Sequence, residues 1–224
     1  MRLFSYCLRY DDGAAPNPFW ELCTLAICKP VIRRVASIGD WVVGFGSTQS
    51  PIGNIADSVV YAMKVTDKMT FQEYDEFCQV HSPHKIPKWD SKIFEYRVGD
   101  CIYDYSQAEQ PVLRPSVHDI SNQETDLGGI NVLMSRHFYY FGDKAVQLPA
   151  LLTPLVHNNQ GHKSTANDPY VDEFVIWIDK LGYTPNQVHG EPQLKNEFIF
   201  NPHINGCCAG RNLQDNDADE RSNC

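Results

Sequence analysis

The chain has 224 residues, of which 42% are hydrophobic, and a formal net charge of −9. The apolar share is large enough to bury a core, whereas the acidic balance argues against a protein that coats nucleic acid non-specifically, although a local basic patch remains compatible with it. The apolar runs are short and interrupted by charges, and the opening MRLFSYCLRYDDG contains no signal-peptide core, so we expect a cytoplasmic protein without a membrane segment.

The first third of the chain predicts a strand, a stiff loop, helical turns and a second strand. Residues 2–10 alternate as a strand, and residues 11–20 form a loop punctuated by glycine and prolines. Apolar residues recur at helical spacing over 21–38, where Pro30 predicts two short helices or a kink, and Gly39 is a C-cap candidate. The next segment, 40–47, reads as a strand with glycines at which something approaches the backbone closely.

The remainder predicts two clear helices and several strands. Residues 57–69 form a strand, and 70–81 a helix capped by Thr70 with Glu73 in the capping-box position. A basic, proline-rich loop follows at 81–92. Shorter strand-like segments lie at 94–98, 101–105, 112–120, 130–135 and 137–142.

The last helix is expected over 167–182, with Asp168 as its cap, Pro169 in its first turn and Gly182 after its end. The absence of an internal repeat or a linker predicts one α+β domain over 1–208, with a mixed, strongly curved sheet or small β-barrel and flanking helices. Residues 209–224 lack apolar periodicity and are expected to form a mobile acidic tail.

The eight cysteines form no C-x-x-C pair, and the nearest approach to a metal site is His203 with Cys207 and Cys208, which lacks a visible fourth ligand. We therefore expect reduced, partly buried thiols and no metal. No P-loop, nucleophile elbow, zinc-protease or dinucleotide motif is found, and we expect no cofactor. Acid–base chemistry through Asp11, Asp12, Lys29 or a histidine stays open, because spacing cannot choose among these residues.

The segment from Asp11 to Ser47 holds the candidate binding residues. Lys29 and Arg33, four residues apart, form a candidate phosphate site, with a solvated helix face as the alternative. Asn17, held between two prolines and followed by Phe19 and Trp20, suits a planar heterocycle, because the amide can read a base edge while a ring stacks on it. The alternative is an ordinary turn with its aromatic rings in the core.

Two strands offer further candidates. Alternation places Trp41, Val43 and Phe45 on one face of their strand and Val42, Gly44 and Gly46 on the other. The glycine face would admit a ligand, with Ser47 as a hydrogen-bond donor at the end of the strand. The alternative is that this face takes part in ordinary sheet packing. In the aromatic strand, Phe138 and Tyr140 should share one face, opposite Tyr139 and Phe141, and Tyr140 could line a base pocket rather than a core.

Three fragments together, APNPFW, CTLAICKPVIRRVASIGDWVVGFGS and FYYFG, resemble the bacterial and phage nucleotide modification associated domain, second type. The resemblance runs from residue 2 to about 161 and is densest over 15–47. It implies an association with modified bases in DNA, and with protein partners in a modification or phage-defence system. It supplies no catalytic residue.

The passage through Arg33 or Arg34, Gly39, Asp40, Phe45 and Ser47 also resembles the PUA-like group, which includes the EVE, ASCH and YTH domains. There the corresponding passage lines a pocket for a flipped or modified base. This sequence departs from the group at GFGS, where a Tyr or His is common. Some ASCH proteins hydrolyse modified cytidine with a Lys and a Thr, a role that this likeness would give to Lys29 and Thr24.

These patterns favour a protein that binds an extruded or modified nucleobase, either as a reader or accessory or as an enzyme that modifies or removes the base. Its partner would be DNA or a nucleotide carrying such a base. The alternatives are a hydrolase or transferase for free modified nucleosides or nucleotides, which suits the acidic charge, and a structural partner in a larger complex. All binding roles depend on one geometric expectation, a pocket between Asn17, Lys29 and Trp41.

Overall fold

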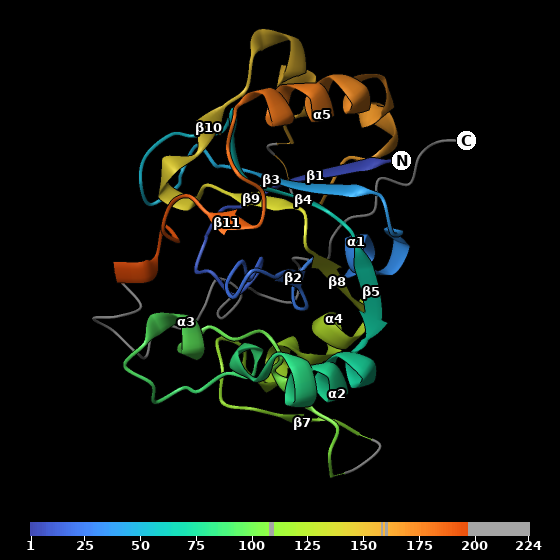
Figure 1. Ribbon diagram of the computed structural model, residues 1–224, viewed down its shortest axis with the longest axis vertical. Helices are drawn as coiled ribbons and strands as arrows, with labels where there is room; N and C mark the ends of the chain where they lie inside the picture. Colours follow the sequence, from blue (N-terminus) through green and yellow to red (C-terminus); the bar gives the residue numbers. More distant parts are fainter. Residues whose placement is uncertain (108–109, 158, 160, 197–224) are drawn as a thin grey trace.

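The computed structural model describes residues 1–107, 110–157, 159 and 161–196. Its centre is a mixed sheet in which β1 and β3 run parallel, β4 runs antiparallel to β3 and β9, and β11 runs parallel to β9 (Figure 1). These strands, with β10 paired to β4, are β1 (Leu3–Cys7), β3 (Trp41–Phe45), β4 (Ser58–Lys64), β9 (Phe138–Tyr140), β10 (Val146–Gln147) and β11 (Gln187–Val188). Since β1 and β11 lie at opposite ends of the order, the sheet is open and the barrel alternative is wrong.

Two smaller sheets accompany the central one. The first has the order β2–β8–β5, with both pairings antiparallel, and the second is the pair β6–β7. Their bounds are β2 (Cys23–Leu25), β5 (Asp67–Thr70), β8 (Asn131–Ser135), β6 (Tyr103–Asp104) and β7 (Val112–Leu113).

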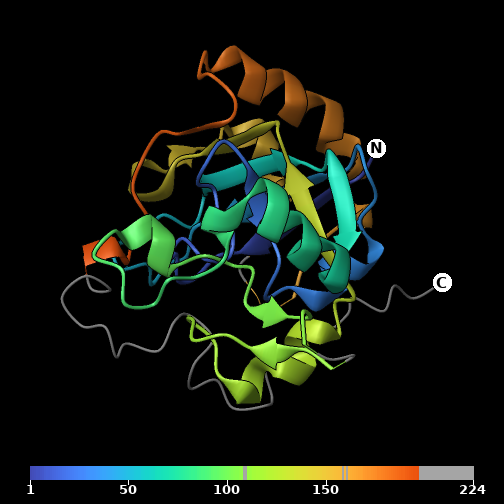
Figure 2. The same ribbon diagram turned by 60° about the horizontal axis from the view of Figure 1, so that its bottom comes forward.

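Helices lie on both sides of the central sheet, with α5 on one side and α2 and α3 on the other (Figure 1). The α-helices are α1 (Pro30–Val35), α2 (Phe71–His81), α3 (Phe94–Arg97), α4 (Gln123–Leu127) and α5 (Val171–Lys180). The 3₁₀ turns are η1 (Pro83–Lys85), η2 (Ile120–Asn122), η3 (Gly142–Lys144), η4 (Ala150–Leu155) and η5 (Thr165–Tyr170). Figure 2 brings the α2 side of the molecule forward, with α4 and the β6–β7 pair beside it. In the part of the chain so described, every helix is too short or too polar to cross a bilayer.

Each face of the central sheet covers its own hydrophobic core. Trp41, Val43 and Phe45 pack toward α5. The side chain of Val42 points to the other face of the sheet and packs in the core that β2, β8 and α2 cover. The alternation expected for β3 is confirmed, as is that of residues 138–141, where Phe138 and Tyr140 share the α2-side core. Because both faces are covered, the aromatic strand has no face left for a pocket.

Several predicted elements are confirmed together with their end signals. Helix α2 begins after Thr70, whose hydroxyl accepts the Glu73 N–H while the Glu73 carboxylate accepts the Thr70 N–H. Gly182 follows α5 with φ 76°, a left-handed conformation that glycine adopts without steric cost. Helix α5 itself begins at Val171, later than expected, and the predicted cap at Asp168 is wrong, because Asp168 and Pro169 lie within the 3₁₀ turn η5.

Several predictions of local structure are wrong, among them the single strand over 57–69, which is two strands, β4 and β5, in different sheets. Residues 23–25 form strand β2 instead of a helix, because pairing with β8 in a buried sheet outweighs their helical spacing. Residues 94–97 form α3 instead of a strand. Gly39 is no helix cap, since α1 ends at Val35 and Gly39 lies in the turn before β3 with φ 94°.

Candidate active site: Cys28, His118 and Asp126

Cys28 lies in the turn between β2 and α1. Cys28 and Lys29 have φ angles of 57° and 43°, in the left-handed region that residues other than glycine seldom occupy. Pro30 begins α1 directly afterwards, so the turn is sharp and places a half-buried thiol at its apex. Strained non-glycine residues of this kind tend to occur at functional sites.

Two residues distant in sequence complete the site. His118, in the segment between β7 and η2, places its Nε2 3.7 Å from the Sγ of Cys28. Its Nδ1 donates to the Oδ2 of Asp126 in α4 over 2.5 Å. Sulfur, imidazole and carboxylate therefore follow one another in the order used by cysteine nucleophiles with a histidine base and an acidic orienting residue.

Asp126 is held by more than the histidine. Its Oδ1 accepts the backbone N–H of Cys28 over 3.0 Å, and its Oδ2 also accepts the hydroxyl of Tyr103 over 2.9 Å. The same carboxylate thus fixes the backbone of the cysteine and the ring of the histidine. With 1% of its surface exposed, Asp126 is closed to solvent, so we regard it as a positioning residue.

The protonation of His118 follows from this environment. Burial alone would lower its pKa, but the charge and the hydrogen bond of Asp126, together with Cys28, outweigh burial and raise the pKa to about 10. Burial would raise the pKa of Asp126, which the charge and hydrogen bond of His118 instead bring below its usual value. At neutral pH the pair is an imidazolium and a carboxylate, and an imidazolium beside a cysteine favours the nucleophilic thiolate.

The two cations expected to hold a phosphate take different places. Arg33 is fully buried, and its guanidinium donates to the carbonyls of Cys28, Asn131 and Asp126. These bonds make it a structural clamp between the cysteine turn and α4. Lys29 is half-buried, with its Nζ 4.9 Å from the centre of the buried Tyr6 ring.

Thr24 and Asn17 lie in a second polar cluster, which is sealed within the protein. The Nζ of Lys85 lies 2.6 Å from Asn17 Oδ1, 2.6 Å from the Leu22 carbonyl and 3.2 Å from Thr24 Oγ1. The Thr24 hydroxyl donates to Asp100 over 2.5 Å. Thr24 therefore has a lysine neighbour, but it is Lys85 and not Lys29, and solvent reaches none of these side chains.

The other predicted residues are dispersed. Phe19 packs edge-on against Phe94, Ser47 caps its own turn through the Gln49 N–H, and Trp20 is exposed. Trp41 lies in the α5-side core beside Phe174. Tyr140 is buried and donates its hydroxyl to Asp11 over 2.6 Å.

The expected pocket between Asn17, Lys29 and Trp41 is therefore not formed. Trp41 points to the opposite side of the central sheet from the cysteine turn. The glycine face of β3 is also filled, since a Cβ on Gly44 would lie 2.5 Å from the Tyr61 ring, which occupies the space. Glycine there admits a neighbouring tyrosine and not a ligand.

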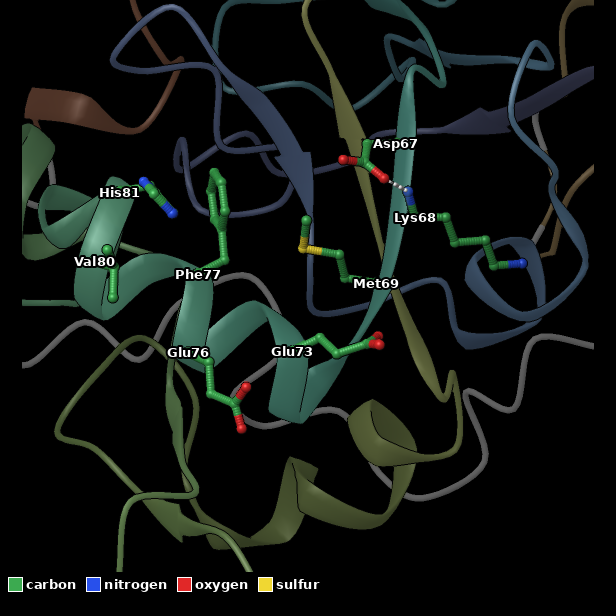
Figure 3. Close-up of a pocket in the computed structure, with 8 residues that line it drawn as sticks. All are labelled: Asp67, Lys68, Met69, Glu73, Glu76, Phe77, Val80 and His81. Atoms are coloured by element: carbon green, nitrogen blue, oxygen red, sulfur yellow. Dashed lines mark hydrogen bonds between the residues drawn. The ribbon is translucent and has the colours of Figure 1, made fainter.

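A groove of about 510 Å³ between β5 and α2 lies apart from this site (Figure 3). Met69 and Phe77 form its apolar floor, and Glu73 and Glu76 project from the helix beside it. None of the three residues of the candidate site lines it. Among the described residues, no group of three or more His, Cys, Asp or Glu side chains is placed to bind a metal, whereas His203, Cys207 and Cys208 lie outside them.

Fold and site together define an α+β protein with a cysteine–histidine–aspartate arrangement. The model of the family described as nucleotide modification associated domain 2 matches residues 1–200, and the chain belongs to this family. The match confirms the resemblance carried by the opening fragments and extends it beyond residue 161. Neither a curated protein nor a solved structure was found to be similar to the chain, and the likeness to PUA-like domains has no further support.

Proposed function

We propose that this protein is an enzyme that uses Cys28 as a covalent nucleophile on a modified nucleobase, either in DNA or in a nucleotide. The observation that carries the proposal is the continuous line from Cys28 Sγ through the ring of His118 to Asp126. The family supplies the theme of nucleotide modification. Without the cysteine geometry, a reader or accessory role would fit equally well.

The reaction class that suits this arrangement is acyl transfer from an exocyclic nitrogen of the base. The Cys28 thiolate attacks the acyl carbon, a C–S bond forms, and the C–N bond breaks as His118 gives its proton to the leaving amine. Water then attacks the thioester carbon while the now neutral His118 takes a proton from that water, the C–S bond breaks, and a carboxylic acid leaves with the Cys28 thiolate and the His118 imidazolium restored. The unmodified base and an acid are the products.

Lys29 is the residue we propose for holding the substrate. It shares the strained turn with Cys28, is half-buried, and has its ammonium over the Tyr6 ring. A lysine in this place can pair with a nucleotide phosphate as a point charge. Replacing Lys29 with Gln should then raise KM for a nucleotide more than for the corresponding nucleoside.

The reactivity of the thiol tests the site without knowledge of the substrate. Alkylation by iodoacetamide, followed by mass spectrometry of peptides, should modify Cys28 rapidly already at pH 6, because the imidazolium stabilises the thiolate. In His118→Asn this reaction should slow at least about tenfold at pH 6 and recover at high pH. Buried Cys78 serves as the internal control. Equal alkylation of Cys28 in both proteins would contradict the proposed pair.

Turnover then identifies the chemistry. The protein is incubated with nucleosides and single-stranded oligonucleotides carrying acylated bases, and the products are analysed by mass spectrometry. Loss of the acyl group with wild type and its retention with Cys28→Ala, at unchanged circular dichroism, is the expected result. Turnover of the nucleosides alone would indicate a free-nucleoside enzyme, and full activity of Cys28→Ala would exclude the mechanism.

A further inference from the structure

Trp20 is held in an exposed turn that its backbone does not favour. Trp20 and Glu21 have φ angles of 65° and 58°, so two successive non-glycine residues occupy the left-handed region. Trp20 is 37% exposed, whereas the other aromatic residues that the sequence proposed for base stacking, Phe19, Trp41 and Tyr140, are at most 6% exposed. The turn thus brings one large ring to the surface when folding alone would favour its burial.

Residues from another segment surround this ring. The centre of the Trp20 ring lies 4.7 Å from that of His84 and 4.9 Å from that of Tyr96. The ammonium of exposed Lys88 lies 4.9 Å from the Tyr96 ring centre. We call these four residues the Trp20 shelf. Contact of several rings with an adjacent cation is the combination that single-stranded nucleic acids use, because bases stack and phosphates need a positive charge.

The exposed cation of the shelf itself is Lys88. Of the four Lys and Arg side chains in residues 82–97, Lys85 and Arg97 are buried, so the cations at the surface are Lys88 and Lys92, alongside Asp90 and Glu95. Burial, followed by the charges of Lys85 and Lys88, lowers the pKa of His84, so that its ring is neutral at pH 7 and adds no charge of its own. The ammonium of Lys88 beside the rings is the feature that favours a nucleic acid over an apolar peptide.

We propose that the Trp20 shelf binds an unpaired segment of a DNA strand, with a base stacked on its rings and a phosphate at Lys88. This proposal rests on the proposed function and deepens it by naming single-stranded DNA as the substrate class. Trp20 and Cys28 lie before and after β2, eight residues apart, and thus at most about 29 Å from each other. A strand bound at the shelf stays within reach of the thiol.

The test is the fluorescence anisotropy of a labelled oligothymidine strand mixed with the full chain at low salt. Trp20→Ala should weaken binding by about 5- to 150-fold, the loss expected for one stacked base. Trp177→Ala is the matched control, since Trp177 lies in α5, on the far side of the central sheet, and should leave binding unchanged. Lys88→Gln, at an exposed position, should weaken binding and reduce the salt slope by about one.

Further measurements separate this proposal from that of the active site. Cys28→Ala should bind the strand as wild type does, and Trp20→Ala should keep the alkylation of Cys28 and any turnover of free nucleosides. If Trp20→Ala does not fold, Lys88→Gln and ultraviolet crosslinking of the strand to Trp20 or Tyr96 decide the question. Binding by both shelf variants within about twofold of wild type, no binding by any protein, or a preference for a proline-rich peptide would overturn the proposal.

Discussion

At the scale of single residues, the molecule separates buried charges that serve structure from a half-buried thiol that can serve chemistry. Arg33 and Lys85 are fully buried and donate hydrogen bonds to carbonyl and side-chain oxygens. Cys28 shares that hydrogen-bonded framework yet keeps partial access to solvent. Reactivity requires this partial access, since a thiol sealed in a core, such as Cys23, is chemically inert.

Asp11 makes a testable contribution to the pH dependence of stability. Burial is the main cause that raises its pKa to about 7, against the lowering effect of the Tyr140 hydrogen bond. The folded protein therefore keeps a proton that the unfolded chain releases near pH 4, and stability from this group is lost as the pH rises from about 4 to 7. The slope is at most about 1.4 kcal/mol per pH unit.

Asp11→Asn should remove that slope, because the amide oxygen can still accept the Tyr140 hydroxyl but does not titrate. Urea unfolding is measured between about pH 4.5 and 7.5, the range around this pKa. The free energy of unfolding of Asp11→Asn should rise relative to that of wild type as the pH rises. A difference between the two proteins that stays constant with pH would show that Asp11 is ionised throughout the range.

At the scale of elements, buried polar clusters join loops that the sheets do not connect. Lys85, at the end of η1, binds the loop before β2, and Thr24 links that strand to Asp100. The Asn17 amide closes the cluster by donating to the Val98 carbonyl over 2.8 Å. These bonds place the loop with Trp20 against the segment that carries Tyr96.

Lys85→Met should therefore destabilise the fold strongly. Removal of the ammonium leaves the buried oxygens of Asn17 and Leu22 without their donor and takes a compensating charge from the neighbourhood of Asp100, a loss of about 3–5 kcal/mol for buried charged clusters. Urea unfolding measures the effect, and Lys180→Met, at an exposed position of α5, should stay within about 0.5 kcal/mol of wild type. An equally small change in the unfolding free energy of Lys85→Met would contradict this prediction and show that the buried acceptors find other partners.

The capping box of α2 gives a smaller and separable prediction. Thr70→Ala removes the hydroxyl that accepts the Glu73 N–H over 3.2 Å and should cost about 1 kcal/mol in unfolding free energy. Thr184→Ala, at an exposed position outside any helix, provides the control. Equal stability of both variants would indicate that water replaces the cap without loss.

At the scale of the whole molecule, the central sheet separates two cores, and the candidate site and the Trp20 shelf both belong to the α2 side. Cys28, Phe19 and Phe94 all contribute to the core on that side, whereas Trp41 and α5 belong to the other. The family match spans 1–200, across both cores. The predicted domain boundary at residue 208 lies beyond it.

Removal of residues 209–224 should leave the melting temperature unchanged, because this segment offers few apolar side chains for a core. Calorimetry of the chain ending at residue 208 checks this. For a domain of this size, about 1 kcal/mol corresponds to roughly 2–4 °C, so a fall of several degrees would place part of the fold beyond the predicted boundary.

The sequence by itself determined the fold class, the family, helix α2 with its capping box and the alternation of β3 and β9. These features rest on local periodicity and on end signals that neighbouring residues carry. It misassigned residues 23–25 and 94–97, because short apolar segments fit helix and strand alike until a pairing partner is known. The wrong pocket had the same cause, since the faces of β3 were predicted but not what covers them.

Only the tertiary structure decided the site. Cys28 lies 90 residues before His118 and 98 before Asp126, and no motif spacing links the three. His118 stood in a segment predicted as a strand, and Asp126 in one with no prediction, so the sequence carried no signal for either. Long-range contacts bring residues together through the packing of whole elements, here α4 and the turn after β2, and this packing is not encoded in the spacing of the residues themselves.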